Sequence, residues 1–137
     1  MVYETTLLLE TEIAVPFTCS NGTGIDKGTI VVLSDPMTVA AHSGANQTFG
    51  GIVKVEKIAS DGMTQVSVYR GGRFKILGSG TITVGDAVVL DSSLNHVTTA
   101  TSANTGGDVV GIALETSATG ESLAVEVRPS ANIPVGG

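Results

Sequence analysis

The chain has 137 residues, of which only 15% are charged, and a net charge of −6 at neutral pH. This length suits one domain with a single modest core. The acidic balance argues against a nucleic-acid partner, because such proteins need lysine and arginine to displace counterions from phosphates. The longest apolar runs are a few residues, far short of the ~20 that a membrane-spanning helix needs, so no membrane partner is expected either.

Low charge and a mean hydropathy of +0.33 predict that the chain covers apolar surface by assembling with other protein. The alternative is a monomer with a large hydrophobic core. A single cysteine cannot form an intrachain disulfide, so no oxidising compartment is required. The N-terminus shows no basic region followed by an apolar core and a cleavage site, and we predict no signal peptide.

Residues 1–20 are predicted to form an N-terminal strand or arm. An apolar leader, Leu7-Leu8-Leu9, precedes alternating apolar positions that reach Phe17. Pro16 lies inside this alternation and cannot donate to a β-ladder, which favours an edge strand or an irregular arm. The leader has no obvious partner in the chain, so we hypothesise that it packs on a neighbouring subunit. Cys19 continues the alternation and is expected to be a small buried hydrophobe rather than a nucleophile.

Short apolar and β-branched runs, separated by glycine and polar residues, predict strands along the rest of the chain. Turns are expected at Asn21-Gly22, Asp61-Gly62 and Gly71-Gly72, and Gly78-Ser79-Gly80 is interpreted as the junction between two halves. The predicted strands lie near residues 28–34, 37–41, 50–58, 64–70, 73–77, 81–84, 86–91, 95–99, 109–115 and 122–128. No segment has the apolar spacing of a helix. Residues 131–137 are expected to form a frayed tail or to serve only in contacts.

The second half of the chain repeats the first. The run from Gly28 to Leu33 returns 57 residues later as Gly85 to Leu90, and Gly51-Ile52-Val53 corresponds to Gly111-Ile112-Ala113. A repeat of this period indicates one supersecondary unit that is used twice to close a common core. We therefore predict an all-β fold with little or no helix, either a compact β-sandwich or a partly closed β-barrel. Its single β domain, 21–130, is built from two related halves at about 24–77 and 81–128.

Nothing in the sequence indicates an active site, so no enzyme activity, cofactor or metal is expected. His42 and His96 are not at the short spacing of a metal pair on one element, and no cysteine joins them. Gly78-Ser79-Gly80 is too short for a nucleophile elbow and has no following helix. Asp86 and Asp91 flank one predicted strand, where turn capping explains them better than paired acid–base chemistry.

Five of the seven basic residues fall in one central stretch, namely Lys54, Lys57, Arg70, Arg73 and Lys75. One interpretation places them on the solvated outer faces of neighbouring strands. The other is a basic patch that docks on an acidic protein surface.

Three runs of the second half carry a family resemblance. They are Gly85-Asp86-Ala87-Val88-Val89-Leu90-Asp91, Asn95-His96-Val97-Thr98-Thr99, and the run from Gly111 to Glu121 with its continuation Val125-Glu126-Val127-Arg128. The first half contributes a degenerate copy that ends in Arg70-Gly71-Gly72-Arg73-Phe74. Over residues 24–128 the chain resembles the small capsid decoration, or cement, proteins of tailed bacteriophages. The segment before residue 20 departs from shorter members of that family.

The resemblance implies a non-enzymatic β protein, made in the host cytoplasm, that binds the outer capsid surface of the virion and stabilises the mature head. Its implied partners are the major capsid protein and further copies of itself, as a trimer where capsomers meet. With the apolar leader and the basic stretch, the candidate interface residues are Leu7, Leu8, Leu9, Lys54, Lys57, Arg70, Arg73, Phe74 and Lys75. The competing class is a head-fibre or surface adhesion module that binds a glycan or receptor.

Overall fold

The computed structural model describes residues 5–44, 47–101 and 109–128. These residues form eleven β-strands and no helix, which confirms the all-β prediction. The strands are β1 (Thr6–Leu9), β2 (Val15–Thr18), β3 (Ile30–Ser34), β4 (Thr38–Ala41), β5 (Phe49–Val53), β6 (Gln65–Tyr69), β7 (Gly72–Gly78), β8 (Ala87–Leu90), β9 (His96–Thr99), β10 (Val109–Ala113) and β11 (Ser122–Val127). The predicted tail, 131–137, lies outside the described residues.

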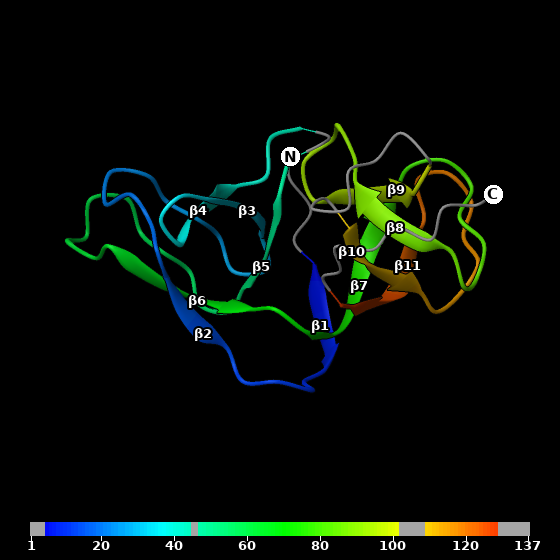
Figure 1. The fold of residues 1–137 in the computed structure, drawn as a ribbon, viewed down its shortest axis with the longest axis horizontal. Helices are drawn as coiled ribbons and strands as arrows, with labels where there is room; N and C mark the ends of the chain where they lie inside the picture. The colour runs from blue at the N-terminus through cyan, green and yellow to red at the C-terminus, as the bar shows by residue number, and fades with distance from the viewer. Residues whose placement is uncertain (1–4, 45–46, 102–108, 129–137) are drawn as a thin grey trace.

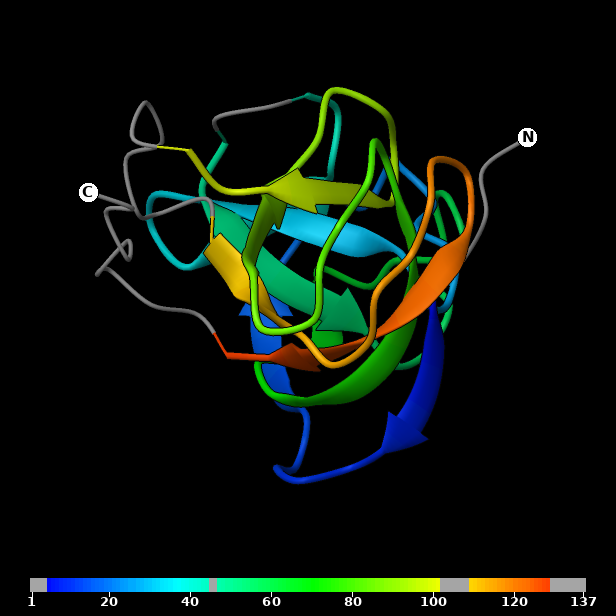
Figure 2. The same ribbon diagram turned by 90° about the vertical axis from the view of Figure 1, so that its right-hand side faces the viewer.

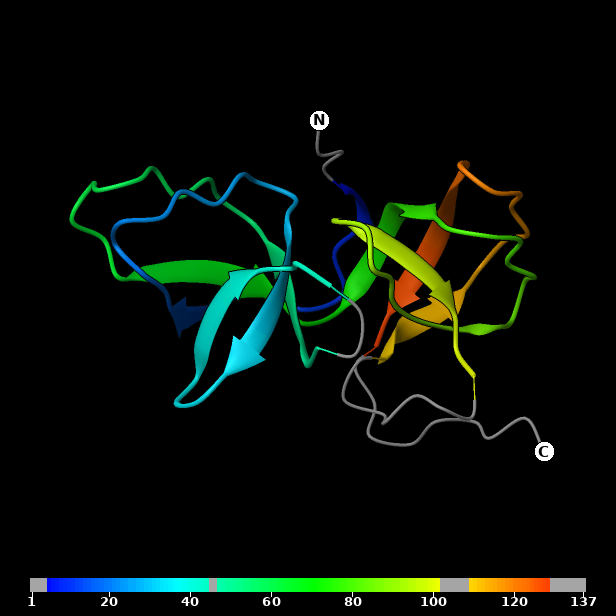
Figure 3. The ribbon, with the colours of Figure 1, turned by 90° about the horizontal axis from the view of Figure 1, so that it is seen from above.

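The strands close two five-stranded barrels that lie side by side (Figures 1 and 3). The first barrel has the strand order β2-β4-β3-β5-β6, and the second has the order β7-β9-β8-β10-β11. Each barrel contains one parallel pair, β2–β4 or β7–β9, and its other pairs are antiparallel. The two related halves predicted from the repeat are therefore confirmed, and each half is a closed barrel.

The barrels meet one strand earlier than the sequence repeat suggested. β7 pairs with β11 and β9 of the second barrel, as β2 pairs with β6 and β4 of the first. The boundary therefore falls at Arg70-Gly71, and Gly78-Ser79-Gly80 lies at the end of β7. The sequence marks this equivalence only weakly, because β2 and β7 share an alternation of apolar residues, Val15 and Phe17 against Phe74 and Ile76, and no identical residue there.

The segment 81–84, predicted as a strand, lies outside the strands and leads into a turn over residues 83–86. Only Ile82 makes a bridge, to Ser117. The Asp86 carboxylate accepts a hydrogen bond of 3.0 Å from the Thr83 N–H, so this aspartate caps the turn that leads into β8. The first barrel has the equivalent bridge between Ile25 and Lys57.

A glycine interrupts the ladder at the same place in each barrel. Gly51 of β5 has a φ of 138° beside a register shift against β3, and Gly111 of β10 lies beside the matching shift against β8. A Cβ at Gly111 would overlap the backbone carbonyl of Glu126 in β11. These bulges let two neighbouring strands approach closely and bend, which closing a small barrel requires.

Apolar side chains fill both barrels and the space between them. The first barrel encloses Phe17, Cys19, Ile25, Val31, Val39, Val53, Val66 and Val68. A second cluster fills the other barrel and extends onto the first through Ile30, Phe49, Ile52 and Tyr69. Tyr69 meets Phe74 edge-on, with ring centroids 5.7 Å apart. Cys19 is buried as predicted, and burial raises the pKa of its thiol.

Residues 1–20, predicted as a strand or arm, contribute one strand to each side. β2 is a member of the first barrel, whereas β1 lies along β7 of the second, with Leu7 opposite Phe74 (Figure 2). Just before β1, the N–H and hydroxyl of Thr5 both donate to the Gly28 carbonyl of the first barrel, at 2.9 and 3.0 Å. β1 thus straps the two barrels together.

A buried polar link also joins the barrels. The Oδ1 of Asn95, from the turn between β8 and β9, accepts the Ile30 N–H at 2.8 Å. The Nδ1 of His42 accepts the Asn95 N–H at 3.2 Å, so its Nε2 carries the proton and donates to the Asp91 carbonyl at 2.7 Å and the Gly44 carbonyl at 3.0 Å. His42 is therefore held neutral between the barrels. Burial is the main cause that lowers its pKa, opposed by these carbonyls and by the Asp91 charge, and reinforced by His96.

We expect the protein to lose stability as the pH falls from 7 to 5. Unfolded His42 takes up a proton near pH 6.5, whereas folded His42 resists protonation to lower pH, so its contribution is present above about pH 6.5 and is lost below it. His42→Gln does not titrate and should show a shallower loss in urea unfolding across this range. His96 is present in both proteins, so equal slopes would contradict the proposed role of His42.

Gly111→Ala should lower the free energy of unfolding by about 3 kcal/mol, because the new Cβ overlaps backbone that cannot move aside. The control is Gly44→Ala, whose Cβ would meet no atom within 4 Å and which should stay within about 0.5 kcal/mol of the original chain. Urea unfolding measures both. A small effect at Gly111 would mean that the bulge is not required.

Candidate interaction surface and inter-barrel pocket

The apolar leader stays at the surface. Leu7, Leu8 and Leu9 are 39%, 51% and 49% exposed, although they form β1. Within the described residues β1 pairs with β7 alone. The leader therefore offers an apolar strand to another protein, because its own chain covers only part of it.

Two candidate interface residues are buried and offer no side chain at the surface. Lys57 is 4% exposed, and its Nζ donates to the Asn21 and Ile58 carbonyls at 3.0 and 2.7 Å and to the Asp61 carboxylate at 2.8 Å. This hydrogen bond lowers the pKa of Asp61. Phe74 is 2% exposed and packs against Tyr69. Lys57 is a structural residue of the β5–β6 loop, and Phe74 belongs to the core between the barrels.

Three other basic residues are already engaged within the chain. Arg70 is half-buried at the barrel boundary, where its guanidinium donates to the Phe49 and Gly50 carbonyls at 3.2 and 3.0 Å. Burial lowers its pKa, and the charge of Glu12 opposes that shift. Arg73 and Lys75 project outward from β7, where they face acidic partners.

Arg73 lies opposite Glu126 of β11, with an N–O distance of 3.6 Å, and the Lys75 ammonium lies 3.9 Å from Glu115. Both pairs are exposed, so each contributes at most about 1 kcal/mol. The central stretch of basic residues therefore does not form one continuous patch. Lys57 lies in the interior and Arg70 at the barrel boundary. The outer face of β7 holds Arg73 and Lys75.

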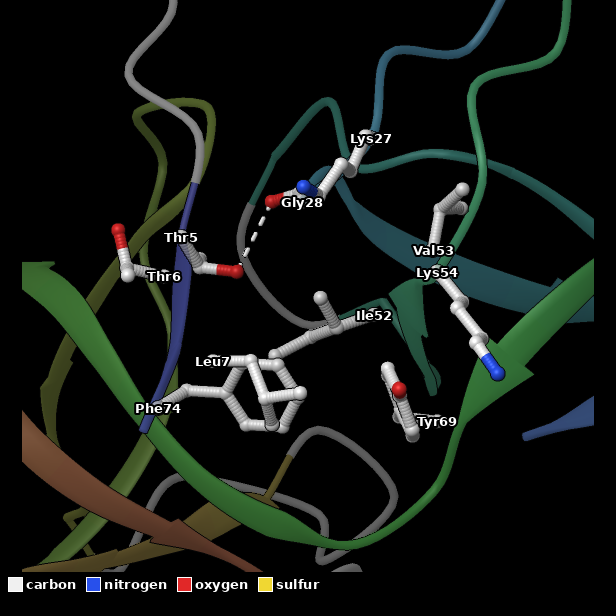
Figure 4. Close-up of a pocket in the computed structure, with 10 residues that line it drawn as sticks. All are labelled: Thr5, Thr6, Leu7, Lys27, Gly28, Ile52, Val53, Lys54, Tyr69 and Phe74. Atoms are coloured by element: carbon white, nitrogen blue, oxygen red, sulfur yellow. Dashed lines mark hydrogen bonds between the residues drawn. The ribbon is translucent and has the colours of Figure 1, made fainter. Parts of the chain in front are cut away.

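Two lysines, Lys54 of the central stretch and Lys27, border a pocket of about 360 Å³ between the barrels (Figure 4). Lys54 follows Val53 at the end of β5, and Lys27 precedes Gly28. The Gly28 N–H donates to the Val53 carbonyl at 2.9 Å, so both lysines flank one hydrogen-bonded corner. The Lys54 ammonium also lies 5.9 Å from the centroid of the Tyr69 ring.

The pocket is bounded by β1 on one side and the first barrel on the other. Its lining residues are Thr5, Thr6, Leu7, Lys27, Gly28, Ile52, Val53, Lys54, Tyr69 and Phe74. Ile52, Tyr69 and Phe74 form a buried apolar floor. Burial is the main cause that raises the pKa of Tyr69, and the neighbouring Glu10 raises it further.

The sequence identified Lys54 but missed Lys27. The two are far apart along the chain and are brought together only when the bulge at Gly51 sets the register between β3 and β5. The repeat held a weak signal, because Gly28 and Val53 match Gly85 and Ala113, which form the same hydrogen bond at 2.8 Å in the second barrel.

The described residues suggest no catalytic constellation. Over the same residues, no three histidine, cysteine, aspartate or glutamate side chains group closely enough to hold a metal ion. His42 is committed to the link between the barrels. In the part of the chain that the structure covers, no helix has the length and apolar character to span a membrane.

Two comparisons with known proteins found a match, one to a protein family and one to a solved structure. The family model described as phage cement protein matches residues 9–129. Among solved structures, the N base of head fiber gp8.5 from bacteriophage phi29 is similar, with a TM-score of 0.55 and 16% sequence identity over 87% of this chain and 98% of that chain. At this identity the likeness concerns the fold alone. No curated protein sequence matches the chain.

Lys57→Met should lower the free energy of unfolding by about 2 kcal/mol, because the Asn21 and Ile58 carbonyls lose their donor. Lys75→Met removes the same charge from an exposed pair and should cost less than about 1 kcal/mol. Thermal or urea unfolding separates the two results. Equal small losses of unfolding free energy in the two variants would mean that the hydrogen bonds of Lys57 do not stabilise the fold.

Proposed function

The chain belongs to the phage cement protein family, and from this membership we propose that it binds the outer surface of a tailed-phage head through the major capsid protein. As a family member it is a structural, capsid-stabilising protein. The proposal extends to a homotrimer seated where capsomers meet, which clamps the mature shell after synthesis in the host cytoplasm. It assigns no enzymatic role to the chain.

The exposed leader is the observation that supports self-association. β1 presents Leu8 and Leu9 half-exposed, and Ile13 in the following loop is 80% exposed. These residues are fixed to the folded body, since Thr5 and Leu7 are held by the two barrels. An apolar strand of this kind is costly to leave in water and is covered when a second copy packs against it.

Cement action also suits a chain without one strong binding site. Each copy on a symmetric shell gains from several modest contacts made at once, because the first contact raises the effective concentration for the others. The apolar leader can serve contacts between copies, while charged side chains serve contacts with the capsid. A rigid pair of barrels keeps these surfaces at a fixed spacing.

A head-fibre base is the second candidate, favoured by the shared fold with the phi29 head fiber structure. Such a base would attach to a head and carry a further module. A glycan-binding role has less support, because the aromatic side chains of the described residues, Phe17, Phe49, Tyr69 and Phe74, are all buried. The base and the cement protein share capsid attachment and differ in what extends from the outer end.

We expect the purified protein to show three times its 13.8 kDa chain mass in light scattering and to co-sediment with mature phage heads at saturating, stoichiometric occupancy. Leu8→Gln/Leu9→Gln should keep the wild-type circular dichroism and shift the mass to that of one chain. The control is Val84→Gln, which removes a similarly exposed apolar side chain outside the leader and should keep the mass of the original protein. A monomeric wild-type protein would contradict the trimer, and failure to bind heads would contradict the capsid function.

A further inference from the structure

The ion pairs of the molecule single out two lysines. Of the seven basic residues, five are held by carboxylates or backbone carbonyls of their own chain, namely Lys57, Arg70, Arg73, Lys75 and Arg128. Lys27 and Lys54 are exposed and form no ion pair within the described residues. Both border the pocket between the barrels. The unpaired positive charge of this acidic chain is therefore concentrated at one place.

The second barrel shows that the fold does not need these lysines. Its equivalent corner, closed by the bond from the Gly85 N–H to the Ala113 carbonyl, has Val84 and Leu114 in the positions of Lys27 and Lys54. Val84 and Leu114 are 56% and 38% exposed. The same backbone corner thus forms with aliphatic side chains, so the corner itself does not require the lysines of the first barrel.

The pocket beneath these lysines has the size and chemistry for one apolar side chain with its neighbouring backbone. Its volume of about 360 Å³ lies at the lower end of the range of ligand pockets. The floor is apolar and fixed, because Ile52 and Phe74 belong to the core between the barrels. The residues that line the pocket include two lysines and no carboxylate, and Glu10 lies near Tyr69.

We propose that this pocket receives an extended acidic segment of the major capsid protein, with an apolar side chain on the floor and flanking carboxylates beside Lys27 and Lys54. The choice of partner rests on the proposed function. Charge complementarity selects the acidic segment, since a basic one would face two unpaired ammonium groups. Residues of both barrels and of β1 line the pocket, so the segment would bind the assembled pair of barrels and not one barrel alone.

The first test replaces Lys27 and Lys54 with the residues at the equivalent positions of the second barrel. Lys27→Val/Lys54→Leu copies the second barrel and should fold normally, yet bind mature heads roughly tenfold more weakly, with less dependence on salt. The control Arg73→Gln/Lys75→Gln removes two charges that are already paired and should bind within about twofold of the original protein. If the original protein binds heads and the Lys27/Lys54 variant binds them equally well, the pocket proposal fails while the capsid function stands.

The second test needs no heads. The probe is the peptide acetyl-Glu-Leu-Glu-amide, titrated into isotope-labelled protein and followed by amide chemical shifts. We expect saturable shifts at Thr6, Gly28 and Val53 that are lost in Lys27→Val/Lys54→Leu. The peptide acetyl-Gln-Leu-Gln-amide is the neutral control. Absence of shifts at the pocket, equal shifts with the neutral peptide, or shifts that persist in the variant would each overturn the proposal, whether or not the protein binds heads.

Discussion

The apolar contact between the two barrels holds them in place and forms the core that they share. Four side chains of the first barrel complete the core of the second, namely those of Ile30, Phe49, Ile52 and Tyr69. Without that contact each barrel is a small domain with little buried surface of its own. The contact also fixes the corner that holds Lys27 and Lys54, and it supplies the floor of the pocket beside them.

Polar groups make this apolar contact specific. The link through His42 and Asn95 satisfies buried backbone groups from both barrels in one arrangement, and a rotated arrangement would leave those groups without partners. β1 adds a strap, because Thr5 bonds to the first barrel while Leu7 lies on the second. Burial and directional hydrogen bonds therefore set the relative placement of the barrels together.

The two barrels carry different side chains at equivalent positions of the same backbone arrangement. At equivalent positions the first barrel has Lys57 where the second has Ser117, and the first has Lys27 where the second has Val84. The backbone register is the same, so these differences are choices of side chain and not of fold. The proposed contacts with a capsid and with further copies would use these two surfaces of unlike chemistry on one rigid frame.

Alternation, turn residues and repeats are local signals, and they were enough to predict the all-β class, the two related halves and the buried Cys19. The sequence also carried the family resemblance in the second half. The boundary between the barrels and the identity of the unpaired basic side chains became visible only in the folded chain. Lys57 and Phe74 turned inward, and Lys27 joined Lys54 across distant parts of the chain. Strand register and barrel packing act between distant residues, and no pattern along the chain records them.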